Sequence, residues 1–253
     1  MSETELVHGL HAVRATLRYE PGGVLAAWLE KGRRDGRMRR LRDELQRAGI
    51  AVETVSRQEL DRLTDGANHQ GVVIRYRGVE PRGEEALLDH LDELAEAPLL
   101  LVLDQVQDPH NLGACLRTAD AAGVHAVVAP RDRAAGLTPT VHKVASGATA
   151  SVAFFQVTNL ARTLKALKQR GVWLVGAADD AVAAPWQLDL AGPLGLVLGG
   201  EGAGLRRLTR ECCDFLTRIP MAGQVESLNV SVATGVLLYE GVRQRSGDGE
   251  HGE

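Results

Sequence analysis

The chain contains 253 residues with a formal net charge of −4, and 44% of its residues are hydrophobic. This composition is ordinary for a soluble globular protein, and the length allows one large domain or two. No apolar run approaches the ~18 residues that a membrane helix needs, and acidic residues at positions 3 and 5 argue against a signal peptide. We therefore expect a cytosolic protein that contacts no membrane.

Residues 1–77 alternate short helical and strand patterns, which predicts a small α/β domain with its own modest core. Helical spacing of apolar residues is found at 9–19, 37–48 and 56–63. The last of these opens with Ser56 and Glu59, the pattern of a capping box. Strand patterns lie at 24–29, 50–55 and 72–76.

Positive charge is concentrated in this first domain. Residues 1–78 hold 14 Lys and Arg against 11 Asp and Glu, whereas the rest of the chain holds 15 against 22. Eight of the basic residues fall between Lys31 and Arg47. Arginine suits the bidentate grip on phosphates that an RNA backbone requires. The alternative is a solvated helix face with internal ion pairs.

Residues 78–97 form the predicted linker between two domains. Pro81, Gly83 and Pro98 bracket a short acidic helix, whose apolar stripe consists of Leu87, Leu88, Leu91 and Leu94. Because such a stripe must be covered, we expect the linker helix to pack against another element.

From Leu99 onward the spacing of apolar segments is typical of a parallel sheet. Short apolar runs lie at 99–103, 124–129, 153–157, 172–177, 194–198 and 215–219. Unbroken runs of this kind are typical of strands covered on both faces, which predicts a doubly wound α/β domain over 98–245. In such a domain ligands bind at the carboxyl ends of the strands. The polar residues at 246–253 are predicted to be a disordered tail.

A helix is predicted from Asn111, as its N-cap, to about Ala122. Its apolar stripe comprises Leu112, Cys115, Leu116, Ala119 and Ala122. This spacing places Arg117 on the opposite face, one turn after Gly113, where the missing side chain would leave room beside the helix.

The predicted strand at 194–198 runs into a turn that contains Gly199, Gly200, Glu201, Gly202 and Gly204. No Lys-Ser/Thr pair follows, so the turn is not a Walker loop, and Leu205 stands where a dinucleotide fingerprint has its last glycine. A carboxylate inside the turn would also repel a pyrophosphate. The turn therefore predicts close backbone approach to a ligand that is not strongly anionic, or simply a tight turn that needs positive φ.

The cysteines indicate neither a disulfide framework nor a structural zinc site. Cys115, Cys212 and Cys213 form no C-x-x-C pair and no cluster with the scattered histidines. No metal site is predicted.

Three motifs follow one another in the second half of the chain. They are Asp108-Pro-x-Asn-x-Gly-x-x-x-Arg117, then Leu198-Gly-Gly-Glu-Gly-x-Gly204 with Ile219-Pro-Met221, then Ser227-Leu-Asn-Val-Ser231. Together they resemble motifs one to three of the SpoU/TrmH family of RNA ribose 2′-O-methyltransferases. Gly9-Leu-His-Ala-Val13 and Asn68-His-Gln-Gly-Val72 resemble the substrate-binding domain in the branch of that family that modifies large-subunit ribosomal RNA.

The resemblance implies a SPOUT-type α/β knot, in which a mostly parallel sheet has its carboxyl-terminal segment tied into a trefoil knot, joined to a small L30e-like α/β domain. It implies S-adenosyl-L-methionine as cofactor, no metal, and a homodimer. The implied target is a guanosine ribose in the peptidyl-transferase region of 23S ribosomal RNA.

The resemblance also implies roles for particular residues. The cofactor would lie against the backbone at Leu198, Gly199, Gly200, Gly202, Ile219, Met221 and Leu228. Arg117 would be catalytic, and Asn111, Glu201, Ser227 and Asn229 would line the site with it. RNA would be bound by Arg33, Arg34 and Arg37 in the first domain and by Lys143 in the second.

Three of these residues have alternative roles. Because a guanidinium remains protonated, we expect Arg117 to hold a phosphate and stabilise the developing alkoxide, although the family assigns the matching Arg as a general base. Glu201 either orients Arg117 or accepts the hydroxyl proton. Ser227 either lines the site or caps the last helix.

Two rival functions are considered beside this one. The first keeps the chemistry but changes the substrate to tRNA or another ribosomal RNA site. The second is a non-catalytic RNA-binding factor of ribosome assembly. The presence of all four polar motif residues argues against this function, namely Asn111, Arg117, Glu201 and Asn229. An NAD-dependent oxidoreductase is excluded, because no glycine fingerprint follows the first strand of the large domain.

Overall fold

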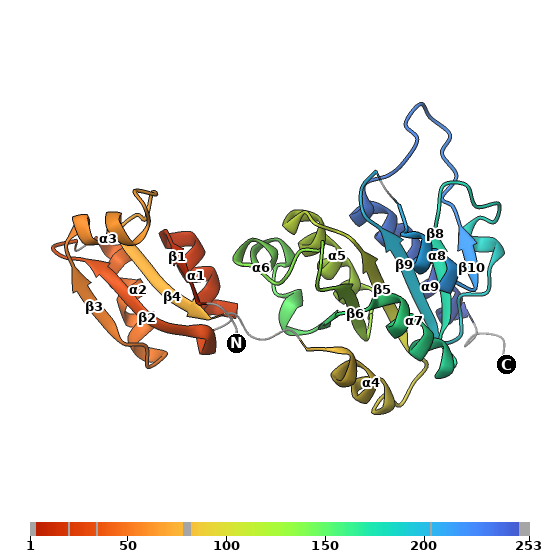
Figure 1. The fold of residues 1–253 in the computed structure, drawn as a ribbon, viewed down its shortest axis with the longest axis horizontal. Helices are drawn as coiled ribbons and strands as arrows, with labels where there is room; N and C mark the ends of the chain where they lie inside the picture. Colours follow the sequence, from red (N-terminus) through yellow and green to blue (C-terminus); the bar gives the residue numbers. More distant parts are fainter. Residues whose placement is uncertain (1–3, 20, 34, 78–81, 203, 248–253) are drawn as a thin grey trace. The chain divides into compact units, whose positions relative to one another are not determined.

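The computed structural model describes residues 4–19, 21–33, 35–77, 82–202 and 204–247. The chain divides into two compact units, Met1–Glu80 and Pro81–Glu253 (Figure 1). Each unit has its own sheet and its own hydrophobic core.

The first unit is a four-stranded mixed sheet with the strand order β1-β4-β2-β3. Its strands are β1 (Thr4–His8), β2 (Val24–Glu30), β3 (Val52–Val55) and β4 (Val72–Arg77). Its helices are α1 (Leu10–Tyr19), α2 (Gly36–Arg47) and α3 (Arg57–Leu63), with a 3-10 turn η1 at Pro21–Gly23. Fully buried Val13, Leu29, Leu41, Leu45 and Ile74 join the sheet to α1 and α2.

The three helices and three strands predicted in this unit are confirmed. Ser56 caps α3 by accepting a hydrogen bond from Glu59 N, as its position predicted. The edge strand β1 was not predicted. It pairs antiparallel with β4, and Leu6 in its middle is 37% exposed, so β1 lacks the apolar pattern of a buried strand.

The second unit is a six-stranded, wholly parallel sheet with the order β10-β8-β9-β5-β6-β7. The strands are β5 (Leu99–Asp104), β6 (Ala126–Pro130), β7 (Ala153–Val157), β8 (Trp173–Ala177), β9 (Leu194–Gly199) and β10 (Phe215–Thr217). All six predicted strands are confirmed. The chain builds outward from β5 through β6 to β7, and then continues on the other side of β5 with β8, β9 and β10. The carboxyl ends of β5 and β9 therefore meet at a switch point of the kind where ligands bind.

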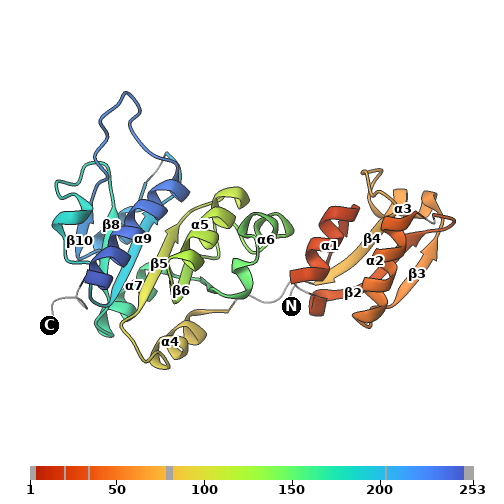
Figure 2. The ribbon, with the colours of Figure 1, turned by 180° about the vertical axis from the view of Figure 1, so that it is seen from behind.

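Helices cover both faces of this sheet (Figures 1 and 2). They are α4 (Glu84–Asp92), α5 (Pro109–Ala121), α6 (Pro139–Ala145), α7 (Leu160–Gln169), α8 (Arg207–Cys212) and α9 (Val230–Gly247), with 3-10 turns η2 (Ala148–Ala150) and η3 (Pro185–Gln187). Leu101 and Leu103 of β5 face the core that holds α5 and α9, whereas Leu100 and Val102 face the core that holds α4 and α7. This alternation confirms the doubly wound α/β prediction.

The linker helix α4 is part of the second unit. Leu87 is fully buried in the core beside α7, and Glu84 accepts hydrogen bonds from Arg162 and Thr163 at 3.0 and 2.9 Å. The expected packing of the linker stripe is thus confirmed for α4, while residues 78–81 lie outside the described residues.

At the other end of the chain, α9 continues to Gly247. The first two residues of the predicted disordered tail are therefore helical, and residues 248–253 lie outside the described part. In the described ranges, no helix has the length and apolar character to cross a membrane.

Arg245 fastens the end of α9 to the start of β5. Its guanidinium donates hydrogen bonds to the carbonyl oxygens of Ala97, Pro98 and Gly192 at 3.0, 2.8 and 2.6 Å. Partial burial lowers the pKa of Arg245 from its ordinary value, although an arginine stays charged at any physiological pH.

We predict that Arg245→Ala lowers the free energy of unfolding by about 1–3 kcal/mol, because three charge-assisted hydrogen bonds are lost together. Urea unfolding followed by circular dichroism measures the change. Arg243→Ala is the control, since Arg243 lies on the same helix, its side chain is 66% exposed, and among the described residues it pairs only with Glu240. Equal losses in the two variants would contradict this role for Arg245.

Candidate functional site

The glycine turn after β9 lies directly against the end of β5. Gly200 forms a β-bridge with Gly204. A Cβ atom at Gly199 would clash with the backbone of Gly204, and one at Gly200 would clash with the carbonyl oxygen of Gln105. At these two positions, then, the close approach predicted from the sequence is to the chain itself. Gly202 and Gly204 have φ angles of +76° and +62°, which a tight turn requires.

An ion pair between a buried carboxylate and a partly exposed arginine holds the far end of the same turn. Asp104, at the end of β5, is fully buried. Its carboxylate accepts hydrogen bonds from Arg206 N at 3.0 Å and from Arg206 Nε at 2.6 Å. A buried carboxylate is stable only with such partners, so the pair fixes the turn relative to β5. Sequence reasoning assigned no role to either residue, because 102 positions separate them.

Three predicted side chains, one from each motif, meet beside this turn. Glu201 Oε1 accepts a hydrogen bond from Asn111 Nδ2 and another from Asn229 Nδ2 at 3.3 Å. Asn229 Nδ2 also lies 3.0 Å from Asn111 Oδ1, to which it donates. We call Asn111, Glu201 and Asn229 the amide–carboxylate cluster. It joins α5, the glycine turn and the start of α9.

Asn111 is not the N-cap that the sequence predicted. The cap of α5 is Asp108, whose carboxylate accepts a hydrogen bond from His110 N at 2.9 Å, and Pro109 is the first helical residue. Proline fits this position because its missing N–H is not needed there. Asn111 thus lies in the first turn of α5 and is only 8% exposed, which leaves its amide free to bind Glu201.

The start of α9 is capped by Asn229 rather than by Ser227. Asn229 Oδ1 accepts hydrogen bonds from Ser231 N at 2.9 Å and from Ser231 Oγ at 2.6 Å. The capping alternative for Ser227 is therefore wrong. Ser227 is exposed in the preceding loop, and its hydroxyl makes no hydrogen bond to any described residue.

Arg117 is exposed on the face of α5 that points away from the apolar stripe, as its spacing predicted. Its guanidinium makes no hydrogen bond or ion pair within the described ranges. The room expected beside Gly113 is filled by α6, because a Cβ atom there would lie 2.7 Å from Val144 Cβ and 3.0 Å from Val141 O. Gly113 therefore serves the close packing of α5 on α6.

The residues predicted to bind the cofactor lie at strand ends and in the loop that leads into α9. Leu198 is buried inside β9, and Gly202 is exposed in the glycine turn. The remaining five positions, Gly199, Gly200, Ile219, Met221 and Leu228, are half-buried. Half-buried residues are partly accessible to a ligand, and the contacts of these five with a cofactor stay a prediction.

The residues predicted to bind RNA fall into different surroundings. Arg33 is engaged within the protein, donating to Asp35 at 2.7 Å and to Gln70 O at 2.5 Å. Arg34 lies outside the described residues. Arg37 is exposed on α2, and Lys143 is exposed on α6. In the described part of the chain, no group of three His, Cys, Asp or Glu side chains is placed to hold a metal ion.

Comparison with known families matches both units. Residues 98–239 match the SpoU rRNA Methylase family, and residues 6–82 match the family described as RNA 2′-O ribose methyltransferase substrate binding.

Individual relatives match over nearly the whole length. The chain is 54% identical to "23S rRNA (guanosine-2′-O-)-methyltransferase RlmB" of Vibrio cholerae, over 95% of this chain and 97% of that protein. It is 53% identical to the protein of the same name from Bordetella pertussis, over 98% of this chain and 100% of the relative. Among solved structures it is similar to the SpoU methyltransferase AviRb from Streptomyces viridochromogenes in complex with AdoMet, with a TM-score of 0.69, 25% identity, and coverage of 96% and 91% of the two chains.

We predict that Gly200→Ala lowers the free energy of unfolding by about 1–3 kcal/mol, because the new methyl group would overlap the carbonyl oxygen of Gln105. Gly223→Ala is the matched control, since Gly223 has open space around it and no left-handed backbone. Urea unfolding of both variants measures the difference. An unchanged stability for Gly200→Ala would mean that the turn does not rest on β5.

Proposed function

The chain belongs to the SpoU rRNA methylase family, and on this premise we propose that it transfers a methyl group from S-adenosyl-L-methionine to the ribose 2′-oxygen of a guanosine in 23S ribosomal RNA. The observation that carries this proposal is the amide–carboxylate cluster, in which one side chain from each of three distant motifs meets beside the glycine turn. The full-length likeness to relatives named for this reaction supports the same substrate.

The residues at this site suit the cofactor. Half-buried Ile219, Met221 and Leu228 offer an apolar surface for an adenine ring, and the carboxylate of Glu201 suits a sulfonium cation better than a phosphate. When bound, S-adenosyl-L-methionine supplies a methyl group that its positive sulfur already activates. The protein's own task is then to align the 2′-hydroxyl, to take up its proton and to hold the RNA phosphate.

Glu201 is the residue that we propose to take up the proton. Its Oε1 atom is held by the two asparagine amides, whereas its Oε2 atom has no hydrogen-bond partner among the described side chains. A carboxylate fixed at one oxygen and open at the other is placed to accept a hydrogen bond from a substrate hydroxyl. In this role Asn111 and Asn229 are positioning residues.

Arg117 is the residue that we propose to hold the RNA beside the acceptor ribose. It is exposed on the same helix as Asn111, and no acidic side chain of the described part neutralises it. A permanently charged guanidinium in that position would bind the neighbouring phosphate and stabilise negative charge that develops on the 2′-oxygen.

We further propose that the carboxyl-terminal segment forms the trefoil knot implied by the family. After β10, at one edge of the sheet, the chain returns to set Asn229 beside Asn111 on α5. Between these two segments, the turn after β9 is fastened to Asp104. A return of the chain past a fastened turn is consistent with a knotted path.

A homodimer is also part of the proposal, and with it a cytoplasmic location, where ribosomal RNA is modified. The support is an apolar stripe on α9, formed by Val232, Val236 and Tyr239, which are 51%, 41% and 50% exposed. Residues at these spacings share one face of a helix, and a contiguous exposed apolar face commonly marks an interface.

We predict that the double variant Val232→Asp/Val236→Asp sediments as a monomer at concentrations where the unaltered protein is a dimer, because two carboxylates would have to be buried in the interface. Val182→Asp is the control, since Val182 is 91% exposed and lies off α9. Sedimentation velocity reports the mass. A dimer that persists in the double variant would remove α9 from the interface.

The function is tested with purified protein, tritiated S-adenosyl-L-methionine and transcribed 23S ribosomal RNA. We predict label in the RNA and, after alkaline hydrolysis, one guanosine whose 3′ linkage resists cleavage. Arg117→Ala should lower the rate of transfer by roughly 100-fold or more, as expected for the loss of transition-state charge stabilisation, while cofactor binding measured by calorimetry stays unchanged.

Lys165→Ala is the control for this experiment, because it removes an exposed positive charge from α7 of the same unit. Its rate should equal that of the unaltered protein. Unchanged turnover in Arg117→Ala would remove Arg117 from the mechanism, and labelling of tRNA in place of 23S ribosomal RNA would overturn the proposed substrate.

A further inference from the structure

The first unit contains a hollow of about 820 Å³, and its lining includes no residue of the amide–carboxylate cluster. It lies between α1, α2, α3 and the loop at 66–71. Its volume falls in the range of about 300–1,000 Å³ that is usual for ligand sites. Five arginines line it, namely Arg14, Arg33, Arg37, Arg40 and Arg57, against only two acidic residues, Glu30 and Asp61.

The loop on one side of this hollow is held in a fixed conformation. His69 is 4% exposed, its Nε2 atom lies 3.0 Å from Asp61 Oδ1, and its Nδ1 atom accepts a hydrogen bond from Gly71 N at 3.0 Å. Because Nδ1 accepts, the ring proton is on Nε2, which donates to Asp61. The buried histidine thus ties the loop to α3.

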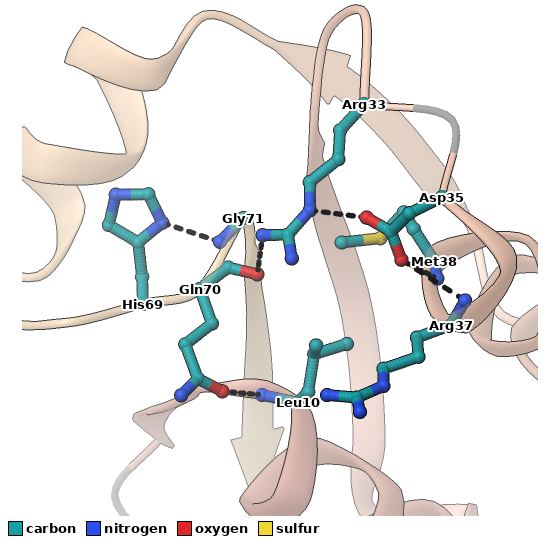
Figure 3. Close-up of polar contacts among 8 residues, drawn as sticks. All are labelled: Leu10, Arg33, Asp35, Arg37, Met38, His69, Gln70 and Gly71. Atoms are coloured by element: carbon teal, nitrogen blue, oxygen red, sulfur yellow. Dashed lines mark hydrogen bonds and ion pairs between the residues drawn. The ribbon is translucent and has the colours of Figure 1, made fainter.

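Gln70 connects the loop to the start of α1 and to Arg33 (Figure 3). Its side-chain oxygen accepts a hydrogen bond from Leu10 N at 3.0 Å, and its backbone oxygen accepts one from Arg33. Gln70 has a φ angle of +51°, which is an unfavourable conformation for a residue with a side chain. Contacts on both sides of a strained residue indicate a surface formed in advance of binding.

Some of the arginines around the hollow are paired with carboxylates and others are not. Arg14 is paired with Glu44, and Arg33 is paired with Asp35. Arg37, Arg40 and Arg57 are exposed, and each lacks an ion pair or side-chain hydrogen bond to the residues that the structure describes. The carboxylate of Glu44 interacts with Arg40 through space only, so the hydrogen-bond donors of all three guanidinium groups remain open to a ligand with several phosphates.

Neutral polar groups at the same hollow suit a nucleobase. Since Gln70 uses its oxygen to bind Leu10, its amide nitrogen remains available as a donor, and Asn68 and His11 are exposed on the lining. An RNA duplex keeps its base edges inside its grooves, whereas an unpaired nucleotide can place its base in a pocket and stack it on arginine. A hollow with both kinds of group therefore fits an unpaired segment.

We propose that this hollow binds an unpaired segment of the RNA substrate, with Arg37, Arg40 and Arg57 on its phosphates and the loop at 68–70 on a base. The inference rests on the proposed function and extends it. Among the residues predicted to bind RNA, Arg33 is left out, because it supports the loop through its hydrogen bond to Gln70 O. Arg40 and Arg57 are added.

The test compares two double variants of the full-length protein. Arg37→Ala/Arg40→Ala removes two charges that line the hollow, and Arg39→Ala/Arg47→Ala removes two exposed charges from the same helix that do not. Fluorescence anisotropy measures binding to an RNA hairpin with an unpaired loop and to a fully paired RNA of equal length, at several salt concentrations. Thermal unfolding checks that both variants are folded, and Arg37→Gln/Arg40→Gln serves if the alanine variant is not.

We expect the unaltered protein to prefer the hairpin. The hollow variant should bind the hairpin ~10-fold or more weakly, and the slope of log K against log salt should fall by about 1.4, or about 0.7 for each lost phosphate contact. The control should change affinity by less than ~2-fold. Equal losses in both variants, or equal affinity for hairpin and duplex, would overturn the hollow as the binding site.

Methyl transfer by the unaltered protein, measured in parallel, separates this inference from the function on which it rests. Normal transfer without the difference between variants overturns the hollow and leaves the function intact. The expected difference without any transfer to ribosomal RNA supports the hollow and overturns the function.

Discussion

One buried carboxylate organises the functional end of the second unit. Asp104 is fully buried at the end of β5, and its carboxylate accepts hydrogen bonds from both the backbone and the side chain of Arg206. Separating the two would leave buried polar oxygens without these partners, which is costly in the protein interior. The turn between β9 and α8 is therefore held against β5, and Glu201, which that turn carries, is held within reach of Asn111 and Asn229.

The two units divide two physical tasks. The first carries the excess of positive charge and a hollow lined by arginine, which suits a polyanion whose binding is electrostatic. The second has more acidic than basic residues and places a carboxylate at its site, which suits a cationic cofactor and proton uptake. The two units thus differ in the sign of the charge that they present.

Much of this architecture was predictable from the sequence, because periodicity reports burial along a single element. The six parallel strands and the exposed side of Arg117 followed from such patterns. Contacts between distant positions did not. These contacts depend on how elements meet in space: the pairing of Asp104 with Arg206, the packing of α6 on Gly113, and the lining of one hollow by both Arg37 and Arg57. Asn111 was misassigned as a cap, since a helix start looks similar with Asp108 or Asn111 as its first polar residue.

The pairing of the two central strands determines the order in which the parts of the chain can fold. All six residues of β5, Leu99–Asp104, pair with β9, Leu194–Gly199, so the middle of the sheet joins segments about a hundred positions apart. Such non-local pairing forms slowly, because the chain loses the entropy of a long loop before the contacts between the strands begin to stabilise it. During translation the first unit can fold as soon as it emerges, whereas the amide–carboxylate cluster cannot form until Asn229 has left the ribosome. The first unit of a nascent chain can thus be folded while the amide–carboxylate cluster is still incomplete.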